Sequence, residues 1–203
     1  MVTSVPKKKA FSKFTLAEAY KQLGLERVVP WHMEFAPVSP TDAFRVHLQR
    51  LQAFDMQRSE EGKKLLIDAI LLEAVQDFKT LKFWKGVYFE GPNSQGTADY
   101  LMTGNRDYFE APLLCVIEAK KDDFEQGLAQ CLVEMQACQW SNAALGRMIA
   151  IFGIVTNGEG WKFYQLKTTG EVLETLLFSV SELGNILGQL KIILRQCEAN
   201  LDG

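Results

Sequence analysis

The sequence predicts an α/β protein in which a mixed central β-sheet lies between helices. The first reason is the order of the expected elements, which runs helix, three strands, helix, two strands and helix. The second is that the segments 113–117 and 148–155 are wholly apolar, which is typical of strands covered on both faces. The third is the core-facing helical spacing of apolar residues across 124–138.

Composition limits the class of protein further. The chain has 203 residues, of which 47% are hydrophobic and 23% charged, and this suits one globular domain with a short appendage. No apolar run approaches the ~20 residues that span a membrane, and no signal peptide follows Met1 to Lys9. We therefore expect a soluble, cytoplasmic protein. The four cysteines form no Cys-x-x-Cys pair, so we expect buried thiols rather than a zinc or redox site.

Residues 1–40 are expected to form an N-terminal helix and an extended connector outside the main domain. The helix covers residues 14–25, with Thr15 as its N-cap and Gly24 as its stop. Three prolines between positions 30 and 40 indicate the connector, because proline cannot continue a helix or a central strand.

The main domain is expected to span residues 41–203 and to open with two helices. The first begins at Thr41 and ends near residue 54; the second is capped by Ser59 and ends near residue 78. From position 65 to 75 the second helix is apolar almost all round, so it should be buried against the sheet. Glu73 is the acidic exception within this stretch.

The remaining elements follow from apolar runs and turn residues. The expected strands are Phe83 to Phe89, Ala98 to Met102, Leu113 to Lys120, Met148 to Val155 and Trp161 to Leu166, and the expected helices are capped at Asp122–Asp123 and at Ser181. A turn over 103–107 can return the chain antiparallel, and a second turn covers 156–160. Large aromatic side chains after this second turn, such as Trp161, are expected to be core packing rather than base-stacking groups.

Charged side chains end the third strand and indicate a functional site. Successive side chains in a strand alternate between faces, so Glu118 and Lys120 should point the same way and Ala119 the opposite way. The antiparallel return should bring Asp99 beside Glu118. Burying charge is costly, so these groups are best explained by a metal, a substrate or mutual pairing at the mouth of a cleft. A simple surface ion pair between Glu118 and Lys120 is the alternative.

Taken together, these residues resemble the PD-(D/E)XK nuclease superfamily. The resemblance consists of an acid in the strand Gly96-Thr97-Ala98-Asp99, the Glu118-Ala119-Lys120 sequence ending the next strand, and a glutamine-bearing helix after it. The segment 153–166, with its Thr-Asn-Gly-x-x-Trp hairpin, is similar to the amino-terminal nuclease domain of type I restriction enzyme motor subunits. The resemblance covers roughly residues 65–166, and Ala98 stands where the family motif has proline. It implies a restriction-endonuclease-like core.

The resemblance also implies roles for the converging residues. Asp99 and Glu118 would hold Mg²⁺, for which Mn²⁺ can substitute, with the backbone carbonyl of Ala119 as a further ligand. Oxygen ligands of this kind suit Mg²⁺. Lys120 would orient or deprotonate the attacking water and steady the charge on the phosphate.

Two further residues enter through the resemblance. Glu73 corresponds to an acid on the helix before the sheet, and we expect its carboxylate near Asp99 or Glu118; a structural role at a helix end is the alternative. Gln130, or less directly Gln126, corresponds to the glutamine near the active site, with a solvated helix residue as the alternative.

The implied function is a divalent-metal-dependent endonuclease that hydrolyses DNA phosphodiester bonds, with DNA and a targeting protein as partners, no membrane partner, and a homodimer as its assembly. The alternative is a non-catalytic module that keeps the nuclease fold and binds nucleic acid or protein. The net charge of −3 counts against tight, independent DNA binding. Serine hydrolase, P-loop and dinucleotide-binding motifs are absent from the sequence.

Overall fold

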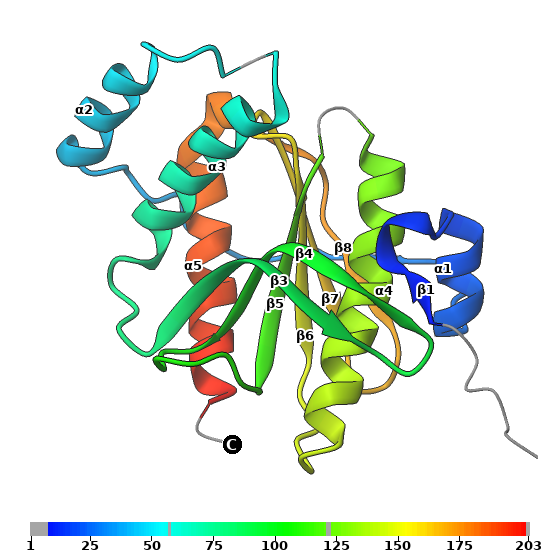
Figure 1. The fold of residues 1–203 in the computed structure, drawn as a ribbon. Helices are drawn as coiled ribbons and strands as arrows, with labels where there is room; N and C mark the ends of the chain where they lie inside the picture. Colours follow the sequence, from blue (N-terminus) through cyan, green and yellow to red (C-terminus); the bar gives the residue numbers. More distant parts are fainter. Residues whose placement is uncertain (1–7, 57, 121–122, 202–203) are drawn as a thin grey trace, which may run out of the picture.

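The computed structural model describes residues 8–56, 58–120 and 123–201, and it confirms the predicted α/β class: a mixed sheet lies between two layers of helices (Figure 1). The α-helices are α1 (Leu16–Leu23), α2 (Asp42–Leu51), α3 (Glu60–Val75), α4 (Phe124–Ala143) and α5 (Leu183–Ala199). Helices α3 and α5 lie on one face of the sheet, and α4 with α1 lies on the other. Helix α2 packs against α3.

The strands of the described residues form one sheet. They are β1 (Lys9–Ala10), β2 (Val29–Pro30), β3 (Leu81–Glu90), β4 (Ser94–Gly104), β5 (Leu113–Ala119), β6 (Ile151–Thr156), β7 (Gly160–Leu166), β8 (Val172–Glu174) and β9 (Phe178–Ser179). Their order is β1-β4-β5-β6-β7-β8-β2, with β3 paired to β4 and β9 to β7. Strands β5 and β6 are parallel, whereas β4–β5 and β6–β7 are antiparallel, as the two predicted turns require.

The N-terminal segment contributes to the sheet more than the sequence predicted. Strand β1 pairs with β4, and β2 pairs with β8. Phe11 and Phe14 are buried in the core on the α4 side, so burial of these rings holds the segment against the main fold. Strands of two or three residues, such as β1, β2 and β8, are too short to show an alternating pattern, which is why the sequence did not reveal them.

The helix caps agree with the sequence analysis. Thr15 forms a capping box with Glu18, and Gly24 ends α1 with a left-handed φ of 68°. The side chains of Thr41 and Ser59 cap α2 and α3, and Asp123 caps α4. Asp122 lies outside the described residues. Helix α3 ends at Val75, three residues earlier than predicted, where a turn begins.

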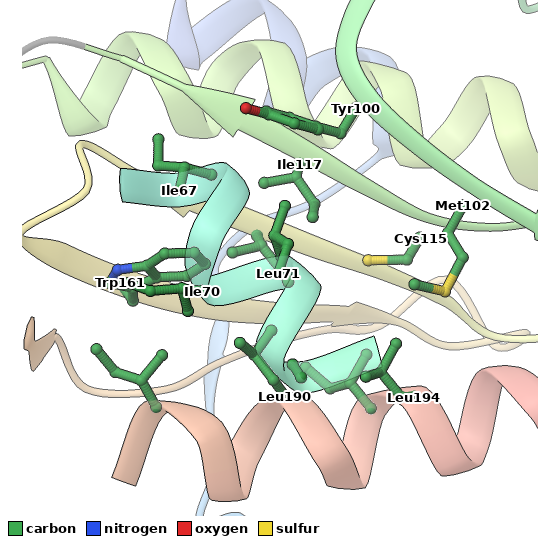
Figure 2. Close-up of a cluster of buried hydrophobic side chains, with 14 of the residues drawn as sticks. Ile67, Ile70, Leu71, Tyr100, Met102, Cys115, Ile117, Trp161, Leu190 and Leu194 are labelled. Atoms are coloured by element: carbon green, nitrogen blue, oxygen red, sulfur yellow. The ribbon is translucent and has the colours of Figure 1, made fainter. Parts of the chain in front are cut away.

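Two apolar cores hold the layers together. Figure 2 shows the first, in which Ile67, Ile70 and Leu71 of α3 meet side chains of the sheet and Leu190 and Leu194 of α5. On the other face, α4 approaches β6 closely: a Cβ at Gly153 would lie 2.6 Å from the sulfur atoms of Cys131 and Met135. All four cysteines are free and buried, as predicted. No helix of the described residues is long and apolar enough to cross a membrane.

Candidate active site

The site lies where strands β4 and β5 separate, at the upper end of β5 in Figure 1. The β4–β5 ladder ends at the pair Tyr100 and Ile117, but the β5–β6 ladder continues to Ala119 and Thr156. Beyond the end of the β4–β5 ladder, Oδ2 of Asp99 accepts a hydrogen bond of 2.9 Å from the backbone N–H of Ala119. A side chain thus replaces the neighbouring strand as acceptor, and the two strands diverge around it.

Asp99, Glu118 and Lys120 converge at this fork as the sequence predicted. Glu118 Oε1 lies 3.5 Å from the backbone nitrogen of Asp99, and Glu118 Oε2 lies 3.2 Å from Nζ of Lys120. Ala119 packs in the core on the opposite face of the sheet, which confirms the predicted alternation. Glu118 is fully buried, whereas the side chains of Asp99 and Lys120 are 21% and 25% exposed. The buried carboxylate of Glu118 therefore lies next to two partly exposed charged side chains.

Helix α4 supplies the predicted glutamine. Nζ of Lys120 donates a 2.9 Å hydrogen bond to Oε1 of Gln130. Gln130 is only 4% exposed, so the alternative of a solvated helix residue is wrong. The side chain of Gln126 donates instead to the backbone carbonyls of Ser12 and Phe14, which ties the N-terminal segment to α4.

Lys64 of α3 also belongs to the site, although the sequence analysis did not select it. Its Nζ lies 2.9 Å from Oδ1 of Asp99 and 3.1 Å from Oε1 of Glu60. Partial burial by itself would lower the pKa of Lys64, but the hydrogen bonds to Asp99 and Glu60 outweigh it and raise the pKa to about 12. Lys64 is therefore a fixed positive charge beside Asp99. The sequence signal was a lysine just before the apolar stretch of the helix.

The prediction that Glu73 lies near Asp99 or Glu118 is wrong. Its two carboxylate oxygens accept hydrogen bonds from the backbone N–H and the hydroxyl of Thr41, at 2.6 and 3.1 Å. Glu73 follows Lys64 by nine residues on α3, which corresponds to about 14 Å along a helix axis. It anchors the start of α2 instead, as in the structural alternative. Helical periodicity correctly predicted a buried face, but it could not show that α2 would cover this end of it.

A second buried acid, Glu134 of α4, lies beside Glu118. Burial raises the pKa of Glu118 to about 7. The hydrogen bond with Glu134 and the charge of Lys120 lower this pKa, but burial outweighs them. Burial and the charge of Glu118 raise the pKa of Glu134 well above its usual range. The Oε2 atom of each group makes no hydrogen bond among the described residues, although Nζ of Lys120 lies 3.2 Å from Oε2 of Glu118. The signal in the sequence was an acid four positions after Gln130, on the apolar face of α4.

This pair predicts a pH dependence of stability. In metal-free protein, a carboxyl group with a raised folded-state pKa binds more protons than in the unfolded chain, so stability falls as pH rises from about 4.5 to about 7. The loss is expected to be on the order of 3 kcal/mol in the free energy of unfolding. Glu134→Gln should make this dependence shallower, because it removes one titrating group. Denaturant unfolding at pH 5 and pH 8, in the presence of a chelator, gives the free energy of unfolding of both proteins. An equal loss between the two pH values in wild type and in Glu134→Gln would contradict the prediction.

The donor set suits a hard cation. Asp99 and Glu118 present carboxylate oxygens at one fork, and Oε2 of Glu118 is buried without a conventional hydrogen bond. The ammonium group of Lys64 pairs with Asp99, and Glu60 is a second partner of the same ammonium group. Within the described ranges no three His, Cys, Asp or Glu side chains gather to hold a metal; the predicted set needs two carboxylates and the carbonyl of Ala119.

Comparison with known proteins adds a partial similarity. No family model matches this chain. Over 133 residues the chain is 29% identical to Crinkler effector protein 1 of Rhizophagus irregularis. The match covers 61% of this chain and 27% of that protein. The matched region thus spans about a quarter of that relative's length.

Proposed function

We propose that this chain is a divalent-metal-dependent nuclease that hydrolyses phosphodiester bonds in DNA. The observation that carries the proposal is the contact network at the end of β5, in which Asp99, Glu118 and Lys120 meet with the amide of Gln130. A surface ion pair does not require a fully buried carboxylate, whereas a site that handles charge away from bulk water does. The PD-(D/E)XK resemblance supports the same interpretation.

In this proposal Asp99 and Glu118 hold Mg²⁺ with the carbonyl of Ala119, and Mn²⁺ can substitute. The ion, when bound, would help to ionise water and stabilise charge on the phosphate oxygens. Lys120 orients the water oxygen that attacks phosphorus; the water gives up a proton to solvent, the bond from phosphorus to the leaving sugar oxygen breaks, and that oxygen takes a proton from solvent. The Lys120 ammonium also offsets negative charge that develops on the phosphate. A lysine suits this role because it is a compact positive charge on a flexible stem.

A non-catalytic binding module remains the second candidate, and one observation favours it. The ammonium groups of Lys64 and Lys120 already pair with Asp99 and Glu118, so each of these two carboxylates has a cationic partner without a metal ion. In that case the fork would be a structural ion-pair network within a nuclease fold. For either candidate, the proposed setting is cytoplasmic, with a homodimer and a protein partner that supplies targeting.

Metal binding separates the two candidates. Mn²⁺ or Mg²⁺ should bind the purified protein and raise its melting temperature, because a ligand that binds only the folded state stabilises it. Asp99→Ala should abolish both effects and retain the fold. Calorimetry and thermal unfolding are the measurements, and Glu73→Gln is the matched control, since Glu73 lies at the far end of α3. Equal metal affinity in wild type and Asp99→Ala would refute the assignment.

A further inference from the structure

A chain of buried side chains leads from helix α4 to Lys120. Nε2 of Gln130 donates a 3.0 Å hydrogen bond to Oε1 of Glu134, and Oε1 of Gln130 accepts a 2.9 Å hydrogen bond from Nζ of Lys120. Gln130 and Glu134 are four residues apart, so they lie one above the other on the same helix face. Glu134 is fully buried among apolar side chains of α4. An acid at such a position requires a specific partner.

Glu134 sets the direction of the Gln130 amide. An amide group offers an oxygen acceptor on one side and an NH₂ donor on the other. With Glu134 accepting, the NH₂ group of Gln130 points toward Glu134 and its oxygen toward Lys120. The reversed amide would direct its NH₂ group at the Lys120 ammonium, placing donor against donor, and its oxygen at a carboxyl oxygen. The acceptor on Glu134 therefore determines whether Lys120 has an acceptor on α4.

With Glu118 as a fourth member, these groups form a closed ring of interactions. Glu134 interacts with Glu118 as well as with Gln130. Glu118 in turn pairs with Lys120, at 3.2 Å. Lys120 is thus held from two sides, by Glu118 of β5 and by Gln130 of α4, and Glu134 interacts with both of these residues.

We propose that Glu134 is a positioning residue: it orients Gln130 and so holds Nζ of Lys120 beside the two carboxylates of the fork. The assignment of a catalytic task to Lys120 rests on the proposed nuclease function. The placement of Lys120 by Glu134 does not, and it can be tested in metal-free protein without any cleavage.

The first test is the reactivity of the Lys120 amine. Reductive methylation followed by mass spectrometry reports how readily each lysine is modified, and Lys64 serves as the internal reference. Glu134→Leu should speed the modification of Lys120 by roughly fivefold, the factor expected for one lost hydrogen bond. Glu134→Gln should stay within about twofold of wild type, because a glutamine at this position still offers an oxygen to Gln130.

A double-mutant comparison guards against an indirect effect of altered packing. Gln130→Leu breaks the same connection one step nearer to Lys120, so it should give a similar increase in modification. Adding Glu134→Leu to it should change the rate no further, because both variants remove one path. Gln136→Leu is the control. Gln136 lies on the same helix but is hydrogen-bonded to Gln22, so its replacement should leave Lys120 at the wild-type rate of modification. Independent, additive effects, or an unchanged rate in Glu134→Leu, would overturn the proposal.

Cleavage kinetics then connect the positioning to the reaction. If the wild type nicks DNA, Glu134→Leu should lower kcat by roughly tenfold with little change in KM, and Glu134→Gln should restore most of it. A lowered melting temperature with an unchanged kcat would mean that Glu134 has only a structural role. If modification of Lys120 follows the expected pattern while the wild type cleaves nothing, the nuclease proposal fails and the positioning stands.

Discussion

Replacing Lys120 with alanine is expected to lower metal-dependent DNA cleavage by roughly two to four powers of ten, the usual scale of general acid–base or electrostatic contributions. Binding of the metal and of DNA should persist, because Asp99 and Glu118 keep their carboxylates. The effect is specific to the ammonium group, which lies 3.2 Å from Glu118 Oε2 and 2.9 Å from Gln130 Oε1. Supercoiled plasmid and a single-stranded circle, each incubated with Mg²⁺ and with Mn²⁺, are the substrates.

Lys162→Ala provides the matched control. Lys162 pairs with Glu174 at 2.8 Å, and its side chain is 26% exposed, close to the 25% of Lys120. It should leave cleavage unchanged. Nicking that survives equally in Lys120→Ala, or that resists a chelator, would mean a contaminant or a different active site. If the wild type is inactive on both substrates and binds no metal, the non-catalytic candidate is supported.

Trp161→Ala is expected to destabilise the protein by about 3–5 kcal/mol, the range for removing a large aromatic side chain from a core. Trp161 is fully buried, stacks on Phe163 and donates from Nε1 to the carbonyl of Gly158, at 3.1 Å. This hydrogen bond closes the turn in which Gly158 has a φ of 86°. The sequence expectation of a core residue is therefore confirmed. Chemical denaturation at fixed pH measures the loss.

Two comparisons locate the source of that loss. Trp161→Phe retains most of the apolar volume but not the hydrogen bond, so it should cost clearly less than the alanine variant. Trp140 is 46% exposed, and Trp140→Ala should change stability by under about 1 kcal/mol. A loss below about 1 kcal/mol for Trp161→Ala would contradict the packing argument. Because the carbonyl of Thr156, beside this turn, accepts from the backbone of Lys120, loosening the turn should also reduce cleavage.

Strand periodicity accounts for the part of the site that could be predicted. The alternation of Glu118, Ala119 and Lys120 follows from the two-residue repeat of a strand, and the antiparallel return of Asp99 follows from a polar turn. Gln130 was reached through the family resemblance, whereas its burial was shown only by the structure. The predicted features are local, and each depends only on residues near in sequence.

Lys64, Glu134 and the true position of Glu73 depended on contacts across the fold. Periodicity tells which way a side chain faces along its own element, but it does not tell which other element lies opposite. Whether Glu73 meets Asp99 or Thr41 depends on where α2 packs, and whether Lys64 reaches Asp99 depends on the crossing of α3 over β4.

The sequence by itself thus determined the α/β class, the helix caps and the shared face of Glu118 and Lys120, because these arise from local backbone geometry and the burial of apolar runs. Only the tertiary structure decided which charges meet. A buried charge is stable only with a partner, and several partners of Asp99, Glu118 and Lys120 come from the helices α3 and α4, which lie in other layers of the fold.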